Sequence, residues 1–241
     1  MNNLIILFKG EIYRMKRYNI LTASVLVSLI WIGFLHFTKV ENVSNIFPLF
    51  IYLDVTSMSI LMIGVTMFFE KQEGTLKSLL VCPINKVEYI LAKSFANISS
   101  NIITLFVLYS YCKLFKEIDI NIGSLLVSII LISFLHSLIG FILTYYSKDF
   151  TQLLVGMMKY AFIFMIPVLL EEVGLIKGEV IKKILYIIPT KAAMVLLKAS
   201  SGLSESFEVV ISYIYLIVVG AILYMIVLKK FDEFSIKESG V

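Results

Sequence analysis

Three ionisable side chains lie inside long apolar stretches of the sequence, where a charge is costly to bury: Asp54, His136 and Lys159. Ionisable residues in such stretches usually face the interior of a helix bundle or a water-filled path. The three are therefore candidates for the wall of a substrate path. They can equally be packing residues, with His136 hydrogen-bonded in the bundle and Lys159 extending its ammonium toward the membrane surface.

Two adjacent glutamates, Glu171 and Glu172, follow Lys159 at the end of the same stretch. A glutamate pair beside a span is also found in some intramembrane metalloproteases of bacteria. Here the only histidines, His36 and His136, precede the pair, and Lys177 stands too far after it to replace the expected arginine. A motif without its context is weak, so proteolysis is a minor alternative and no metal site is expected.

A charged connector separates the second apolar stretch from the third. It reads Glu70-Lys71-Gln72-Glu73-Gly74-Thr75-Leu76-Lys77-Ser78-Leu79-Leu80-Val81-Cys82-Pro83. Leu76, Leu79 and Leu80 have the spacing of one helix face, and a face of this kind is typical of a partner groove. Gly74 and Thr75 predict a bend and a helix N-cap in front of them.

A second helix is predicted directly after the connector. Asn85 and Glu88 have capping-box spacing, so the helix should begin near Lys86 and continue unbroken into the third span. The cysteines, Cys82 in the connector and Cys112 near the far end of that span, are expected on opposite membrane faces. They therefore form neither a disulfide nor a metal site.

The composition predicts an all-α polytopic membrane protein. The 241 residues are 59% hydrophobic and 16% charged, against roughly 25% charged in soluble domains. The apolar runs are long and unbroken, which fits spanning helices of about 20 residues rather than a β-barrel. Six spans are expected, at about 19–38, 48–69, 93–115, 122–146, 152–172 and 208–229.

Lysines and arginines in the short loops predict the orientation, with both termini in the cytoplasm. Residues 1–18 alternate apolar and basic side chains at helical spacing, which favours an amphipathic helix in the headgroup region, although a flexible basic tail remains open. The segment 174–206 carries four lysines in or beside short apolar runs, so we expect short helices that dip into or rest on the outer leaflet. The chain 1–241 is predicted to be a single domain, with 70–92 as its cytoplasmic connector.

The connector, continued by Glu88-Tyr89-Ile90-Leu91-Ala92-Lys93, resembles the signature of ABC type-2 exporter permeases. The layout of the chain is also similar, including Ile187-Ile188-Pro189-Thr190 before the last span. Among members of this family, the short bacterial permeases for drug export or antimicrobial-peptide immunity are the most similar. The resemblance implies that the connector is a coupling helix which contacts an ATPase. The contact maps to Glu70, Glu73, Gly74, Thr75 and Leu76, with Leu79 and Leu80 on the leucine face.

The resemblance also implies partners and a location. A permease of this kind resides in the bacterial cell membrane, pairs with a second copy or a sister permease, and rests on two copies of a cytosolic ABC ATPase. The sequence has no Gly-x-x-x-x-Gly-Lys-Ser/Thr loop, so ATP and Mg²⁺ should bind the ATPase, and this chain should be neither an enzyme nor a cofactor protein. Nucleic-acid binding has no support. The expected function is export of an amphiphilic drug, peptide or lipid-like compound; the alternative is a non-transporting anchor or sensor subunit.

Overall fold

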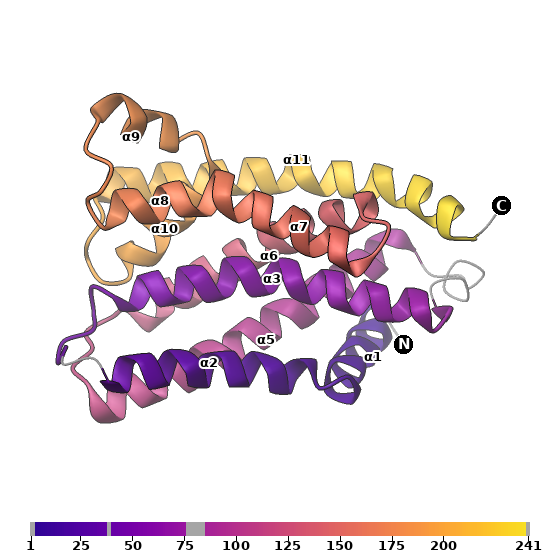
Figure 1. Ribbon diagram of the computed structural model, residues 1–241, viewed down its shortest axis with the longest axis horizontal. Coiled ribbons are helices and arrows are strands. Elements are labelled where there is room, and N and C mark those ends of the chain that lie inside the picture. The colour runs from indigo at the N-terminus through magenta and orange to yellow at the C-terminus, as the bar shows by residue number, and fades with distance from the viewer. Residues whose placement is uncertain (1–2, 38–39, 76–84, 240–241) are drawn as a thin grey trace.

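The computed structural model describes residues 3–37, 40–75 and 85–239, and within them the chain is helical with one isolated β-bridge, Asn42 to Glu117. The elements are α1 (Asn3–Arg17), α2 (Ile20–Phe37), α3 (Phe47–Gln72), α5 (Lys86–Phe115), α6 (Ile122–Tyr146), α7 (Phe150–Tyr160), a π-helix η1 (Ala161–Met165), α8 (Ile166–Glu172), α9 (Glu179–Leu185), α10 (Pro189–Ala199) and α11 (Ser206–Ser239). Figure 1 shows their arrangement. The predicted all-α class is confirmed, and the described residues include six helices that are long and apolar enough to cross a membrane.

The six candidate spans fall where the sequence predicts them, and they differ mainly at their ends. The helix of the third span begins at Lys86, as predicted, because the Asn85 side chain accepts from the backbone at Val87 and Glu88 completes the capping box. The second span continues to Gln72, and the sixth extends through Phe234. The helices are longer than the apolar stretches because each helix also includes end turns with polar residues, which the apolar stretches leave out.

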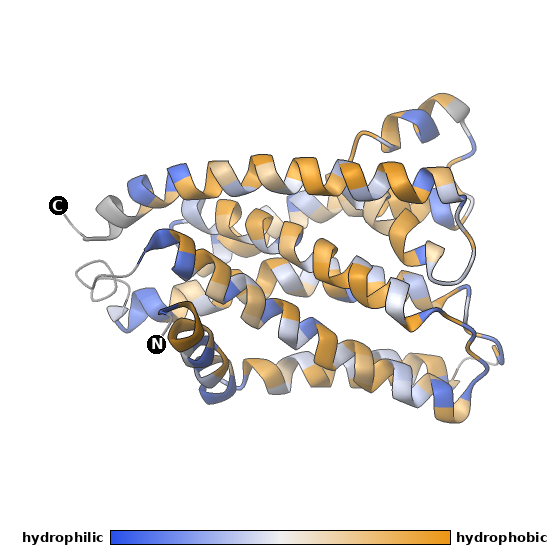
Figure 2. Ribbon diagram, turned by 180° about the vertical axis from the view of Figure 1, so that it is seen from behind, coloured by the Kyte–Doolittle hydropathy of each residue, from blue (hydrophilic) through white to orange (hydrophobic). Residues whose placement is uncertain are grey.

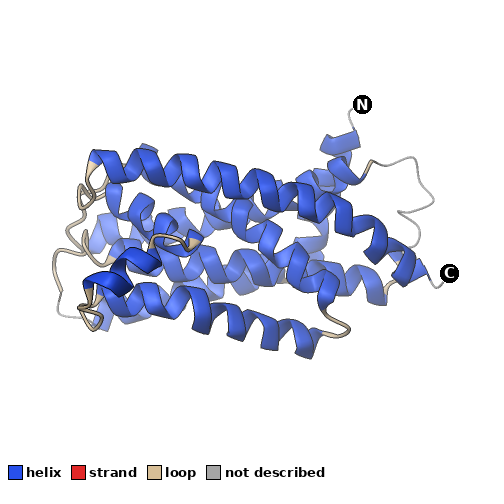
Figure 3. Cartoon of the chain, turned by 90° about the horizontal axis from the view of Figure 1, so that it is seen from above, coloured by secondary structure: helices blue, strands red, loops and turns tan. Residues whose placement is uncertain are grey.

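Three helices form the centre of the bundle, and three cover it. In α3, α5 and α6, 61–67% of the most apolar window is buried, against 17–22% in α2, in the α7–α8 span and in α11. Figure 3 shows the long helices running side by side along the length of the molecule. The outer helices therefore present apolar faces that a bilayer would cover.

Helices α3 and α6 pack closely at Gly140. A Cβ atom there would lie 3.0 Å from the carbonyl oxygen of Ile60, so a larger side chain would force the backbone at this crossing to shift. The serines Ser128, Ser133 and Ser137 lie on buried positions of α6. Small side chains at these positions let the neighbouring helices approach α6 closely.

The two ends of the bundle differ. Both termini and the approach to the connector lie at one end, with α9 and α10 at the other (Figure 1), and polar residues gather toward the ends (Figure 2). The helix α10 is packed into the bundle, with Met194, Leu196 and Leu197 fully buried, whereas α9 exposes Val180 and Ile184. The segment 174–206 thus contains the short helices expected, one inserted among the span ends and one at the surface.

The fifth span is not a regular helix. It changes from α7 to the π-helix η1 and back to α8, where Pro167 follows within the first turn. Proline lacks an N–H group and crowds the preceding turn, so the wider π turn accommodates it.

Candidate functional site

The root of the connector is well defined up to Thr75. Helix α3 ends at Gln72, Glu73 is its C-cap, and Gly74 adopts a φ of 67°, the left-handed conformation that ends many helices. The Thr75 hydroxyl donates to the backbone oxygen of Glu70 at 3.2 Å. Gly74 therefore supplies the predicted bend, and Thr75 contacts the helix behind it. Leu76, Leu79 and Leu80 lie outside the described residues.

Glu70 lies inside the bundle and not in the connector, which corrects the expected start of that segment from Glu70 to Glu73. Its side chain is 1% exposed, because α3 continues one turn further than expected and turns the carboxylate toward α1 and α5. There it meets Arg14 at 2.8 Å, Lys93 at 3.0 Å and the hydroxyl of Tyr89, which donates at 2.6 Å. Glu73, by contrast, is exposed.

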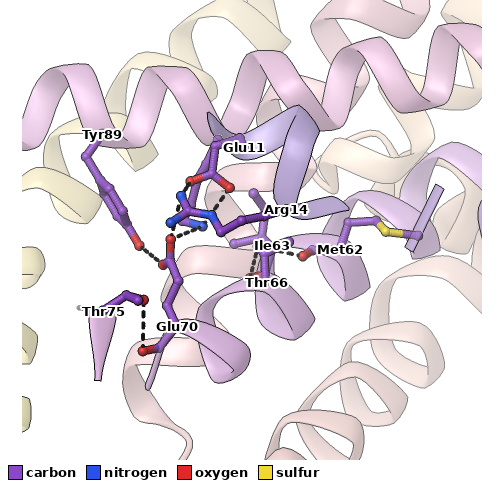
Figure 4. Close-up of polar contacts among 9 residues, drawn as sticks. Glu11, Arg14, Met62, Ile63, Thr66, Glu70, Thr75 and Tyr89 are labelled. Atoms are coloured by element: carbon purple, nitrogen blue, oxygen red, sulfur yellow. Dashed lines mark hydrogen bonds and ion pairs between the residues drawn. The ribbon is translucent and has the colours of Figure 1, made fainter. Parts of the chain in front are cut away.

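A second carboxylate, Glu11 of α1, completes the group. It pairs with Lys93 at 3.0 Å and with Arg14 one turn along its own helix. Figure 4 shows Glu11, Arg14 and Tyr89 converging on Glu70 at the end of α3. We call Glu11, Arg14, Glu70, Tyr89 and Lys93 the inner ion cluster. Its two carboxylates balance its two cations, as buried charges require.

Charge balance also keeps the arginine ionised. Burial lowers the pKa of Arg14, but the carboxylates of Glu70 and Glu11 outweigh this effect, and its pKa lies above the ordinary value. Glu11 and Arg14 belong to the polar side chains of the amphipathic N-terminal helix, where solvated positions are expected. In the structure these two side chains pack against the bundle, whereas Lys9, Lys16 and Arg17 are exposed.

A line of buried polar side chains continues from the inner ion cluster along α5. Asn97 donates to the backbone oxygen of Ser59 at 3.0 Å and to Ser137 at 2.7 Å, and Asn101 donates to Ser59 Oγ at 2.8 Å and Ser133 Oγ at 2.9 Å. These contacts join α5 to α3 and α6. We call the residues Asp54, Ser59, Asn97, Asn101, Thr104, Ser133 and Ser137 the polar seam. Its signal in the sequence was the three- and four-residue spacing of Lys93, Asn97, Asn101 and Thr104 within an apolar helix.

The structure does not bring the three predicted path residues together. Asp54 ends the polar seam, accepting from Thr104 at 3.0 Å. His136 is fully buried between the backbone oxygen of Ile132 at 2.8 Å and the hydroxyl of Tyr160 at 3.1 Å. Lys159 is exposed on α7. Asp54 and His136 thus hold helices together, and Lys159 alone projects from the bundle.

A groove lies between α3 and the α7–η1 segment, and Lys159 is not among the residues that line it. It has a volume of about 300 Å³ and is apolar apart from one serine and one tyrosine. Its lining residues are Ser57, Ile60, Leu154, Met157, Met158, Tyr160, Ala161 and Met165. Methionine side chains adapt to ligands of different shape, so a groove of this composition suits varied apolar molecules.

The glutamate pair at the end of α8 forms ion pairs with lysines. Lys191 of α10 meets Glu171 and, at 3.1 Å, Glu172, while Lys198 meets Glu172 at 2.5 Å. In the part of the chain that the structure describes, no group of three His, Cys, Asp or Glu residues could hold a metal ion. The pair therefore fastens α10 to the fifth span.

Comparison with known proteins identifies relatives over the whole length. The family model described as the fluoroquinolones export permease protein family matches residues 2–239. Two fluoroquinolones export permease proteins of Mycobacterium tuberculosis, from strains CDC 1551 and H37Rv, are each 26% identical over 243 residues, covering all of both chains. These relatives agree with the resemblance to ABC type-2 export permeases, and with the six spans they make the chain a multi-pass protein of the cell membrane. A match over nearly every residue shows that this chain belongs to the fluoroquinolone export permease family.

Proposed function

We propose that this chain is the permease subunit of an ATP-driven exporter that moves amphiphilic drugs out of the cell. The observation that carries the proposal is the family match over residues 2–239, together with relatives named for fluoroquinolone export. Because the sequence holds no phosphate-binding loop, we assign ATP and Mg²⁺ to two copies of a separate ATPase. A second permease copy or a sister permease completes the assembly.

The inner ion cluster suggests how force would reach the spans. The ATPase is proposed to contact the segment 73–85, including Glu73, Gly74, Thr75 and the leucine face. Three residues before Glu73, the Glu70 carboxylate is held by Arg14 of α1 and Lys93 of α5. Motion of the connector would therefore move α1, α3 and α5 together, because buried ion pairs are costly to separate.

The groove between α3 and the α7–η1 segment is the proposed first contact for substrate. A fluoroquinolone combines an aromatic ring system with a carboxylate, so its rings would pack on Met157, Met158 and Tyr160, and the exposed Lys159 of the same helix would attract its carboxylate electrostatically. A lipid-like compound or peptide with an acidic group would fit the same surface.

Purification from cells tests the proposal. A tagged chain in native membranes should recover an ABC ATPase, and deletion of the gene should raise sensitivity to fluoroquinolones. Replacing Glu73 with Arg should leave ATP hydrolysis in place but lower transport per ATP. Transport that continues in cells lacking any partner ATPase would contradict the ATP-driven mechanism.

An anchor or sensor subunit is the other candidate. It would also bind an ATPase, but its deletion would leave drug accumulation unchanged. Measuring accumulation of a fluorescent quinolone in the deletion strain separates the two functions.

A further inference from the structure

A small cavity lies where the inner ion cluster meets the polar seam. Its volume is about 10 Å³, and it is enclosed by α1, α3 and α5. Four polar residues line it, Glu11, Thr66, Lys93 and Asn97, together with Met15, Met62, Ile63 and Ala96. Figure 4 shows Met62, Ile63 and Thr66 of α3 beside the Glu11–Arg14 contact.

One lining group lacks a partner within the described chain. Asn97 is 2% exposed, and its amide nitrogen donates to the backbone oxygen of Ser59 and to Ser137. The contact with a carbonyl fixes which amide atom is nitrogen, because a carbonyl can only accept. The amide oxygen is then a buried acceptor that no described donor reaches. Such groups are rarely left unsatisfied in native proteins.

A donor lines the same cavity one helical turn before Asn97 on α5. Lys93 carries three N–H groups, and the carboxylates of Glu11 and Glu70 take two of them at 3.0 Å each. Thr66 uses its hydroxyl proton for the backbone of Met62 at 2.9 Å and Ile63 at 3.0 Å, which leaves its oxygen able to accept. The cavity thus offers a donor from α5 and acceptors from α1, α3 and α5.

We infer that one water molecule binds in this cavity, accepting from Lys93 and donating to the amide oxygen of Asn97 and to the hydroxyl oxygen of Thr66. A volume of about 10–15 Å³ accommodates a single water, and a buried water takes two to four polar partners. The water makes the hydrogen bonds continuous from Arg14 and Glu70 at the inner end to Asp54. Through this water, Lys93 links the other members of the inner ion cluster to the side-chain amide of Asn97 on α5.

Hydroxyl-radical footprinting by X-ray radiolysis tests this site, because radicals form from waters bound next to a side chain. Met15 and Met62 line the cavity and are 2% and 4% exposed, and Met194 is 0% exposed in the outer apolar core. In the full-length chain in nanodiscs, Met15 or Met62 should oxidise well above the rate of Met194. Oxidation of both at the Met194 rate would overturn the inference.

Two variants show whether the cavity water is the source. Ala96→Val adds volume to the cavity wall while every polar group stays, so oxidation of Met15 and Met62 should fall to the Met194 rate. Ala92→Val is the matched control, since Ala92 is equally buried on α5, at 1%, and does not line the cavity. It should leave the oxidation unchanged.

Thr66→Val covers the case in which Ala96→Val does not fold. It removes one polar partner without changing the shape of the side chain, and oxidation of Met62 should fall. Unchanged oxidation of Met15 and Met62 in whichever variant folds, verified by an unchanged melting temperature, would overturn the inference.

Discussion

Glu70 and Lys93 are charged residues near helix ends that are nevertheless buried and ion-paired. Glu70 lies two residues before the end of α3, where a solvated position is the usual expectation, and Lys93 lies seven residues after the polar start of α5. Both are buried at 1% side-chain exposure, and each has two oppositely charged partners. Removing one member leaves another charge buried without compensation, which costs more than the pair itself contributes.

We predict that Lys93→Met destabilises the protein by about 3–5 kcal/mol, because Glu11 and Glu70 would then share Arg14 alone. The measurement is thermal or denaturant unfolding in detergent. The matched control is Lys86→Met on the same helix, whose ion pair with Asp232 is exposed at both ends. It should cost only about 0.2–1 kcal/mol. Equal losses for the two variants would show that the cluster is not a stabilising unit.

Lys159 is a charged residue in the opposite environment, because its side chain on α7 is exposed and not buried. We predict that Lys159→Glu lowers fluoroquinolone resistance with little change in stability, because the exposed side chain contributes a charge and little packing. Lys159→Arg should retain resistance. Minimum inhibitory concentrations in a strain complemented with each variant provide the measurement, and Lys182→Glu on the exposed surface of α9 is the control. Resistance unchanged in Lys159→Glu would remove Lys159 from the proposed substrate contact.

At the scale of elements, the α3–α6 crossing is the rigid centre to which the other helices attach. We predict that Gly140→Val destabilises the fold by about 1–3 kcal/mol, since its Cβ would contact the backbone of Ile60 at 3.0 Å. Gly33→Val on α2 is the control, because a Cβ there meets nothing within 4 Å. The melting temperatures of the two variants in detergent measure the difference. A Gly33 variant as unstable as the Gly140 variant would show that helix propensity, and not the crossing, causes the loss.

The start of α5 offers a second test at this scale. We predict that Asn85→Ala costs about 1 kcal/mol, because the side chain that caps the Val87 backbone is lost. Asn85→Ser should recover most of this loss, since serine also caps. Unfolding in detergent measures both variants, and an equal loss in Ala and Ser would contradict the capping role.

At the scale of the whole molecule, both termini lie at the same end as the approach to the connector (Figure 1). The loop charges predict that this end lies in the cytoplasm. We predict that Glu205→Cys is labelled by an impermeant maleimide in intact cells and that Lys148→Cys is labelled only after permeabilisation. The background is a chain with Cys82 and Cys112 replaced by serine. The reverse labelling pattern would invert the proposed orientation.

Much of the fold was predictable because the bilayer imposes simple rules. Six apolar stretches gave six helices, and the capping box at Asn85 and Glu88 correctly predicted where the third begins. The site was less predictable. Asp54, His136 and Lys159 were all recognised as ionisable residues within apolar stretches. Their positions along those stretches do not determine whether each side chain faces the bundle or its surroundings.

The sequence by itself determined the class of the protein, its six spans and its family. Each apolar segment forms a spanning helix because of its own hydrophobicity and its own backbone hydrogen bonds. Neither depends on which other helices pack against it. Only the tertiary structure decided that Glu11, Arg14, Glu70 and Lys93 form one cluster, and that Lys159 faces outward while His136 faces inward. These outcomes depend on how each helix is rotated against its neighbours, and packing between α1, α3, α5 and α6 sets that rotation.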